Sequence, residues 1–384
     1  MYNSLRVPVA DPKRSYLAHK EAIDRAITKV LSEGHYILGK EVAAFQASFA
    51  AFVGVSAAVG VGSGTDALAL ALRAHGIARG DGVVTVSHTS VATVAAAELV
   101  GAVPVLADIE PAFYTLDPVS LERALAGHIS GGHGTKPPIK AVIVVHLYGQ
   151  PAAMWEIASI CARRDIVIIE DCAQAHDAAL ADRGVGSWGT AAFSFYPTKN
   201  LGALGDGGAV TTNDPAIAEK VKMLREYGWR QRYVSEILGV SSRLDELQAG
   251  ILRAKLPRLR DENRRRQAIA LAYDEGLGDA IGRPARRAGA NHVFHQYVVR
   301  VPEREAFQET LRRRGIGTNV HYPVPVHLQP AYRDRVWLVG GALPVTERTA
   351  NEVLSLPMFP ELTDDEVALT IKTILDVCRS RQAA

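Results

Sequence analysis

The sequence has few cysteines and no long apolar run. Its 384 residues include three cysteines, Cys161, Cys172 and Cys378, and no two of them have C-x-x-C spacing. An odd number without that spacing argues against a disulfide framework and a zinc site, and it favours a reducing cytoplasm. The most apolar stretches, 91–107 and 141–148, are short or interrupted, so we expect no bilayer-spanning segment. The first residues lack the apolar run of a signal peptide.

An excess of charge of one sign is also lacking. Lysine and arginine total 43 and aspartate and glutamate total 41, which gives a formal net charge of +2. Because the numbers of basic and acidic residues are nearly equal, the composition predicts neither a nucleic-acid partner nor binding to a membrane surface. We interpret the basic run 264–266 as a solvated helix face, because lysine and arginine are rarely buried.

Hydrophobic residues and glycine are plentiful. They amount to 48% of the chain and 33 residues respectively, as in a folded globular enzyme. The length exceeds what one hydrophobic core usually serves, so we expect two domains. Apolar runs typical of buried strands, at 83–88, 103–107, 141–148 and 166–171, alternate with helical segments. This alternation predicts an α/β fold in which helices flank a mostly parallel sheet.

The pattern changes in the second half of the chain. A long arginine-rich helical stretch, 243–275, contains Pro257, which predicts a kink or a break. The residues after it have the pattern of a strand and a helix of a smaller unit. We therefore expect a large domain over 1–245, with an N-terminal helical segment, and a smaller C-terminal α/β domain over 246–384.

A lysine stands in a glycine-rich turn after a predicted strand. The string FSFYPTKNLGALGDGGAV, residues 193–210, places Lys199 behind the strand and ahead of four glycines. Glycines let the backbone and a cofactor approach closely. A lysine that forms an imine needs such a site, where its amine is reachable in the neutral form. For a lone lysine, an ordinary surface loop would be the simpler explanation.

Two acidic residues end another apolar strand, in the string IVIIEDCAQAHDA, residues 166–178. Ligands bind at the carboxyl ends of the strands of an open parallel sheet. Asp171 is therefore placed to pair with a protonated pyridine nitrogen, which keeps the ring electron-poor. The alternative is that Asp171 caps the segment that follows it. Gln174 lies on the same turn.

A third string, GVGSGTDALALAL at residues 60–72, is a glycine-rich turn that opens a helix. The free N–H groups and the helix dipole of such a turn suit a phosphate. The string is not G-x-G-x-x-G, and it lacks the lysine of a P-loop. A tight turn with Ser63 or Thr65 as the helix cap explains it equally well. The three strings together are more specific than any one of them.

These strings resemble the sugar aminotransferases of the DegT/DnrJ/EryC1/StrS family, which are fold-type I pyridoxal-phosphate (PLP) enzymes. The resemblance extends from GHYILGKEVAAFQASFAAFVG (34–54) to SLPMFPELTDDEV (355–367). It implies that Lys199 carries the Schiff base, that Asp171 holds the pyridine nitrogen and that Gln174 contacts the ring and its 3′-oxygen. It also implies phosphate contacts from Gly64, Thr65 and Ser194.

The same resemblance implies a homodimer with its active site at the interface. The string GVSSRLDELQAGIL (239–252) resembles the segment by which family members reach the neighbouring site. Ser241 stands where asparagine is the usual phosphate ligand across that interface. Ser90 stands where an aromatic residue commonly stacks on the cofactor ring, which makes His88 a candidate substitute. Tyr36 is assigned to substrate binding.

The loop NVHYPVPVHLQPAY, residues 319–332, indicates which sugar the protein would bind. Its prolines fix the backbone, and His321, Tyr322 and His327 supply the donors and acceptors that a hydroxyl-rich sugar needs. Loop packing explains either histidine alone. By resemblance, HYPxPxHLQ implies amination at C3 of a 3-keto-6-deoxyhexose linked to a nucleoside diphosphate, commonly dTDP, with glutamate as the amino donor.

Other functions fit parts of this pattern. An aminotransferase that acts at C4, or on a UDP- or GDP-linked sugar, would use the same fold. A sugar dehydratase of the family would carry histidine in place of Lys199. A nicotinamide-dependent sugar oxidoreductase would use the 60–72 turn but leaves Lys199 unexplained. A non-catalytic regulator with the same fold would not need the full set of catalytic residues.

Overall fold

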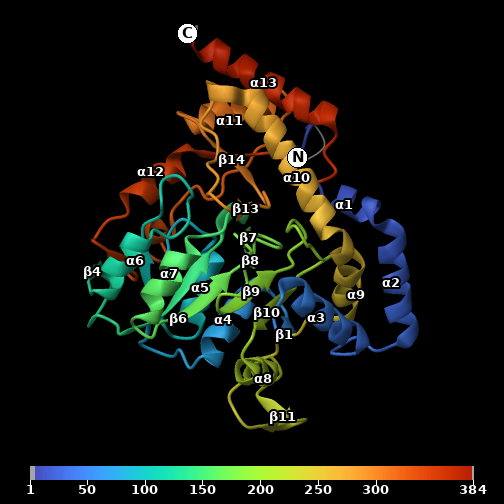
Figure 1. Cartoon of the computed structure of the whole chain (residues 1–384), viewed down its shortest axis with the longest axis vertical. Coiled ribbons are helices and arrows are strands. Elements are labelled where there is room, and N and C mark those ends of the chain that lie inside the picture. Colours follow the sequence, from blue (N-terminus) through green and yellow to red (C-terminus); the bar gives the residue numbers. More distant parts are fainter. Residues whose placement is uncertain (1–4, 383–384) are drawn as a thin grey trace.

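The computed structural model describes residues 5–382, and its centre is a nine-stranded mixed sheet (Figure 1). In spatial order the strands are β1 (Ala57–Val61), β10 (Gly208–Thr212), β9 (Thr190–Ser194), β6 (Val167–Asp171), β5 (Ile139–Val145), β2 (Gly82–Val86), β3 (Val103–Ala107), β15 (Trp337–Val339) and β4 (Ile129–Gly131). From β9 to β15 each strand runs parallel to the next. The pairs at both ends of the sheet are antiparallel.

The inner strands are buried on both faces because their sequences are continuous apolar runs. Val83 and Val84, which point to opposite faces of β2, are both fully buried. One face is covered by α4 (Gly64–Ala74), α5 (Val91–Leu99) and α8 (Pro215–Leu224). The other is covered by α6 (Pro118–Leu125) and α7 (Met154–Ala162). The predicted α/β class is therefore confirmed.

The N-terminal helices pack beside this sheet against the start of the C-terminal half. The second of them, α2, ends at Gly34, which caps it with φ 68°. The predicted break at Pro257 is also confirmed, because this residue lies in a short 3-10 turn between two helices. The helices are α1 (Pro12–Ala18), α2 (Lys20–Glu33), α3 (Lys40–Val53), α9 (Glu246–Lys255), η2 (Leu256–Arg258) and α10 (Leu259–Leu277).

A smaller unit with its own core follows. Its core contains Tyr273, Tyr297, Leu354 and Ile374, all fully buried. A two-stranded antiparallel sheet lies beneath helices that cap the upper part of the molecule (Figure 1). Its elements are β14 (Tyr297–Arg300), α11 (Arg304–Arg313), α12 (Pro344–Glu352), β16 (Val353–Leu356) and α13 (Asp364–Gln382).

Two strands from beyond the predicted domain boundary pair with strands of the large domain. β15, which lies beyond the predicted boundary at 245, pairs with β3 and β4 of the large sheet. The strands β13 (Ala290–Asn291) and β8 (Arg183–Gly184) both pair with β7 (Ala179–Leu180). The boundary between 245 and 246 therefore marks where the first C-terminal helix, α9, begins. Strand pairs join residues on the two sides of that boundary.

The interpretation of residues 264–266 as a solvated face is right for Arg264 and wrong for Arg266. The Arg264 side chain is 70% exposed. Arg266 is buried, and its guanidinium donates to the carbonyl oxygen of Met358 at 2.9 Å and to that of Phe294 at 3.4 Å. Its neighbours therefore replace the water that an exposed arginine would bind.

Several short elements connect the larger ones. They are η1 (Leu147–Gly149), β11 (Trp229–Gln231), β12 (Val234–Ser235), η3 (Gly278–Ala280) and η4 (Val326–Leu328). The β11–β12 hairpin projects from the body of the molecule beyond α8 (Figure 1). Among residues 5–382, no helix has both the length and the apolar character to cross a membrane.

Candidate active site

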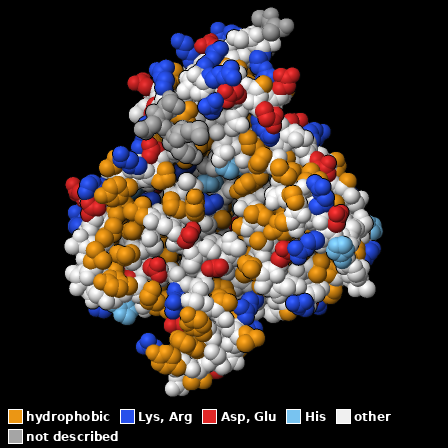
Figure 2. Space-filling model, turned by 180° about the vertical axis from the view of Figure 1, so that it is seen from behind, with side chains coloured by type: hydrophobic (Ala, Val, Ile, Leu, Met, Phe, Trp, Pro, Cys, Tyr) orange, Lys and Arg blue, Asp and Glu red, His pale blue; other side chains and the backbone are white. Residues whose placement is uncertain are grey.

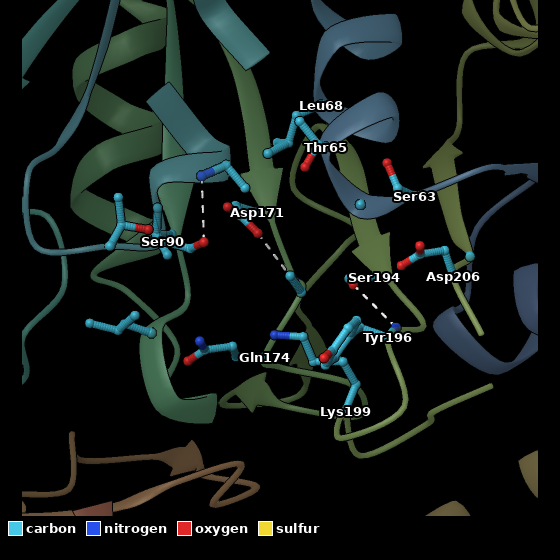
Figure 3. Close-up of a pocket in the computed structure, with 17 residues that line it drawn as sticks. Ser63, Thr65, Leu68, Ser90, Asp171, Gln174, Ser194, Tyr196, Lys199 and Asp206 are labelled. Atoms are coloured by element: carbon cyan, nitrogen blue, oxygen red, sulfur yellow. Dashed lines mark hydrogen bonds between the residues drawn. The ribbon is translucent and has the colours of Figure 1, made fainter. Parts of the chain in front are cut away.

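Residues from all three strings meet in one pocket (Figure 3). It is a cavity of about 280 Å³ at the carboxyl ends of the parallel strands, where an open sheet usually binds its ligand. Its walls include six of the residues predicted from sequence: Gly64, Thr65, Asp171, Gln174, Ser194 and Lys199.

The turn between β1 and α4 forms one wall. Ser63 is the N-cap of α4, and its hydroxyl accepts the N–H of Asp66 at 3.1 Å. Thr65 is therefore free of the capping role and lines the pocket. A Cβ atom at Gly64 would lie 2.7 Å from Ser194 Cβ, so only glycine lets the helix start come this close to the end of β9. The result is an anion cradle with the positive end of a helix behind it.

Asp171 forms the floor of the pocket. Its Oδ2 accepts the Thr93 hydroxyl at 2.8 Å, and its Oδ1 accepts the N–H of Ala173 at 3.2 Å. The capping alternative is therefore realised in part, yet the carboxyl group also lines the cavity. Burial raises the pKa of Asp171, although the hydrogen bonds from Thr93 and Ala173 oppose the rise. A cation placed against this carboxylate would offset the cost of its burial.

Lys199 lies opposite, in the turn after β9, where its N–H bonds to the Tyr196 carbonyl oxygen at 2.8 Å. Its side chain enters the pocket from below in Figure 3. Burial lowers the pKa of Lys199 to about 8, and the charge of Asp171 opposes that shift. Roughly a tenth of this amine is therefore neutral at pH 7, far more than for an ordinary lysine, and the neutral form is the one that attacks a carbonyl carbon.

Gln174 connects the pocket to the C-terminal half. Its Oε1 accepts the N–H of Tyr148 at 2.7 Å, and its Nε2 donates to the Tyr322 hydroxyl at 3.1 Å. Tyr322 and His321 therefore lie behind Gln174 and outside the residues that line the cavity. The His321 ring bonds to Ser355 Oγ at 2.8 Å, and burial lowers the pKa of His321 to about 4.

His88 and His327 do not line the cavity. His88 is fully buried against the rings of Tyr114 and Tyr148, so this geometry gives it no face to stack on a cofactor ring. Both ring nitrogens of His327 are engaged, by Ser87 Oγ at 2.7 Å and by Glu347 Oε1 at 3.2 Å. The prediction that His327 lines the sugar pocket therefore has no support in these contacts.

Tyr36 and Ser241 lie on the surface of this chain. Tyr36 is 48% exposed, and its carbonyl oxygen accepts the N–H of Glu246. Ser241 is exposed as well, next to the projecting hairpin. The adjacent Ser242 turns inward, where its hydroxyl donates to Asp66 Oδ2 at 2.7 Å and accepts the N–H of Gly62 at 3.0 Å. A contact of Ser241 with another copy of the chain stays a prediction.

Sequence reasoning missed several residues of the site. Ser90, Tyr196 and Asp206 line the cavity without having been assigned a contact there. Tyr196 and Asp206 stand in the same string as Lys199, so their place beside it could have been inferred. Thr93 could not, because nothing local in the sequence indicates that its hydroxyl reaches a carboxylate 78 residues further on.

A buried cluster beneath the pocket has the residue types of a metal site. It consists of His146, Glu170 and Cys172. The Glu170 carboxylate accepts the N–H groups of Gly186, Trp188 and Gly189 and bonds to His146. The other ring nitrogen of His146 accepts the N–H of Ala152. The atoms that could bind a metal therefore make hydrogen bonds instead, and those of Glu170 join the end of β6 to the loop before β9.

The pocket suits a phosphorylated aromatic aldehyde. The cradle at Gly64 and Ser194 is shaped by the absence of a side chain, as a phosphate requires. Within residues 5–382, the buried carboxyl of Asp171 has no cationic hydrogen-bond partner, which a protonated ring nitrogen would supply. The Lys199 amine can condense with the aldehyde. These are the three features that PLP needs.

Comparison with known proteins agrees with this assignment. The profile of the DegT/DnrJ/EryC1/StrS aminotransferase family matches residues 18–375. A dTDP-3-amino-3,4,6-trideoxy-alpha-D-glucose transaminase of Streptomyces venezuelae is 44% identical, over 96% of this chain and 95% of that protein. A UDP-N-acetyl-3-dehydro-alpha-D-glucosamine 3-aminotransferase of Acidithiobacillus ferrooxidans is 40% identical, over 96% of this chain and 97% of that protein.

A solved structure has the same fold. It is S. venezuelae DesV in complex with a ketimine intermediate, which superimposes with a TM-score of 0.92 at 43% identity. The superposition covers 97% of this chain and 99% of the DesV chain. The expectation of a fold-type I architecture is therefore confirmed over nearly the full length of both proteins.

Proposed function

Because the chain belongs to the DegT/DnrJ/EryC1/StrS aminotransferase family, we propose that it aminates a nucleotide-linked keto-sugar with PLP as its cofactor. The observation that carries the proposal is that Lys199 and Asp171 line one pocket, next to an anion cradle. A dehydratase of the family would have histidine at position 199. Family membership removes the support for a nicotinamide-dependent oxidoreductase.

Each residue of the pocket has a distinct task. Lys199 holds the cofactor covalently and, once displaced by the amino donor, moves a proton as general base and acid. Asp171 keeps the ring nitrogen protonated, and Gly64, Thr65 and Ser194 bind the phosphate. When bound, PLP supplies an electron sink for the carbanion formed at the carbon that loses its proton. Glutamate is the proposed amino donor, and this part rests on the family resemblance alone.

The proposed substrate is a dTDP-linked 3-keto-6-deoxyhexose, aminated at C3. Relatives that are 40% and 44% identical carry names that place the amino group at C3, one on a dTDP sugar and one on a UDP sugar. The alternatives are therefore a different nucleotide or amination at C4.

The test is direct competition with glutamate as donor. We expect a higher kcat/KM for the 3-keto sugar than for its matched 4-keto isomer. We also expect a higher kcat/KM for the dTDP-linked sugar than for the UDP-linked one. A preference for the 4-keto compound would overturn the regiochemistry and leave the aminotransferase assignment in place.

We further propose a homodimer with a shared site. The segment around the projecting hairpin exposes Tyr227, Tyr233, Val234, Leu238 and Val240, each at 40% or more. Figure 2 shows hydrophobic side chains gathered on this projection and on the face beside it. A second copy of the chain would cover this surface and bring its own Ser241 to the neighbouring cradle.

A complementation experiment tests the shared site. Lys199→Ala and Ser241→Glu dimers, each disabled alone, should regain activity when they are mixed, because a hybrid dimer has one intact site. Random exchange would restore about a quarter of the wild-type sites. An active monomer in light scattering would contradict the proposal.

A cytoplasmic location, supported by three unpaired cysteines, stays part of the proposal.

A further inference from the structure

Tyr148 occupies an unusual place behind the pocket. It follows β5 in η1, is 3% exposed and adopts φ 60° and ψ 2°, in the left-handed region that residues other than glycine rarely enter. The next residue, Gly149, comes so close to the C-terminal half that a Cβ atom there would lie 2.8 Å from Val293 Cγ2. The backbone at Tyr148 thus has a costly conformation, next to the close approach of Gly149 to the C-terminal half.

This conformation closes a ring of hydrogen bonds. The N–H of Tyr148 donates to Gln174 Oε1 at 2.7 Å. Gln174 Nε2 donates to the Tyr322 hydroxyl at 3.1 Å. The Tyr148 hydroxyl then donates to the carbonyl oxygen of His321, the residue before Tyr322. The ring joins the ends of β5 and β6 in the large sheet to the 319–332 loop of the C-terminal half.

His88 completes the ring from behind. Its Nε2 lies 2.9 Å from the Tyr148 hydroxyl. That hydroxyl has one proton, which it gives to His321, so His88 must be the donor in this contact. Nδ1 of His88 is then bare, and it has no hydrogen-bond partner among residues 5–382. Burial lowers the pKa of His88 to about 4, which agrees with a neutral ring that donates through Nε2.

The ring decides how Gln174 faces the pocket. An amide side chain can turn by 180° and exchange its oxygen and nitrogen, unless a neighbour distinguishes them. Here the backbone N–H of Tyr148 can donate only to the amide oxygen, so the NH₂ group points toward Tyr322 and the cavity. The same contacts tie the 319–332 loop to Gln174, which lines the cavity together with Lys199.

We propose that Tyr148 and His88 are positioning residues for the transfer of the amino group to the sugar: they orient the Gln174 amide and anchor the His321–Tyr322 loop. His88 therefore acts through Tyr148, without touching the cofactor ring. This inference rests on the proposed function for its substrate, while the anchoring itself is a property of the chain alone.

The test compares Tyr148→Phe and His88→Phe with Tyr114→Phe. Tyr114 is a matched control, since its ring lies 5.9 Å from that of Tyr148 and its hydroxyl makes no hydrogen bond within residues 5–382. We expect Tyr148→Phe to raise KM for the keto-sugar about five- to tenfold, the effect of one lost hydrogen bond. Absorbance of the lysine-bound cofactor should persist. His88→Phe should also raise KM for the keto-sugar. The double variant should have a KM no higher than that of Tyr148→Phe alone, because His88 acts through Tyr148.

Hydrogen exchange supplies a readout that needs no substrate. In the holoenzyme, Tyr148→Phe should speed exchange of the amides in residues 319–328, whereas Tyr114→Phe should not. Unchanged exchange in that loop, or a lower Tm with an unchanged KM, would overturn the proposal. If the wild type turns over no keto-sugar, the proposed function fails, and the exchange result still decides whether Tyr148 anchors the loop.

Discussion

In the proposed site, the chain specifies the cofactor side and the substrate side differently. On the cofactor side, Gly64, Asp171, Ser194 and Lys199 each lie at or just beyond the end of a strand. On the substrate side, the predicted residues come from a loop of the C-terminal half and from the surface of the chain. The comparison teaches that strand ends can be read from short strings, whereas loop contacts depend on distant neighbours.

Lys199→Ala should produce the largest effect and would break the cofactor side outright. Without the amine, the cofactor has no covalent attachment and the proton has no carrier, so turnover should fall by more than about 10³-fold. Loss of the visible absorbance of the bound cofactor measures the first effect, and single-turnover rates measure the second. Lys222→Ala, at an exposed position of α8, is the control. A Lys199→Ala enzyme near the wild-type rate would refute the assignment.

Asp171→Asn should come next. The amide keeps the size of the side chain. Its oxygen can still accept the N–H of Ala173 and its NH₂ group can donate to the Thr93 hydroxyl, but it has no charge to offer a pyridinium. We expect the fold to survive and kcat to fall by about 10²- to 10³-fold, since a buried charge pair at the reacting system is lost. Asp206→Asn, at the mouth of the same pocket, should cost much less. Equal activity for Asp171→Asn and the wild type would leave Asp171 with its capping role alone.

Gly64→Ala sharpens the claim that the cradle is shaped by close approach. The new methyl group would lie 2.7 Å from Ser194 Cβ, so α4 or β9 must shift and the phosphate site must widen. PLP affinity, titrated by fluorescence, should weaken about tenfold, the loss of one or two charge-assisted hydrogen bonds.

Gly250→Ala is the matched control for this variant. It sits in a helix where a Cβ atom would make ordinary contact at 3.6 Å, so it should leave PLP affinity unchanged. If the two variants bound PLP equally, close approach at Gly64 would not shape the cradle.

The pH dependence of cofactor capture tests the electrostatics of the same side. The pKa of Lys199 is lowered to about 8, so the amine of the apo-protein is mostly protonated below that pH and mostly neutral above it. Only the neutral amine attacks the aldehyde. The rate of PLP capture should therefore rise about tenfold per pH unit up to pH 8 and then level off. A plateau only near pH 10 would mean that Lys199 behaves as an exposed lysine.

Much of the fold could be predicted because its elements have local signals. Apolar runs marked the inner strands, and Pro257 marked the break in the long helical stretch. The place of β15 could not be predicted. This strand has only three residues, too few to show a periodic pattern, and its pairing with β3 is set by packing across the molecule. The burial of Arg266 was missed for a similar reason: its carbonyl partners lie 28 and 92 residues away.

The same reason divides the site. Three strings predicted residues that line the pocket, because each string forms its own strand end and turn. A polar side chain in a loop is harder to assign, because its hydrogen bonds may be satisfied by residues far along the chain. His88 and His327 both looked free in the sequence, and both are engaged, by Tyr148 and by Ser87.

The smallest expected effect on catalysis is that of His327→Phe, which separates packing from substrate contact within one loop. The ring bridges Ser87 and Glu347, so its replacement should lower the Tm by about 2 °C through lost hydrogen bonds. KM for the keto-sugar should stay within about twofold, because no ring nitrogen is left to meet a hydroxyl group. Tyr322→Phe removes the hydroxyl that Gln174 contacts, so it should raise that KM about tenfold with little change in Tm. If His327→Phe raised KM more than Tyr322→Phe, the sugar would lie against His327, and the substrate side of the pocket would be built on the far end of the loop.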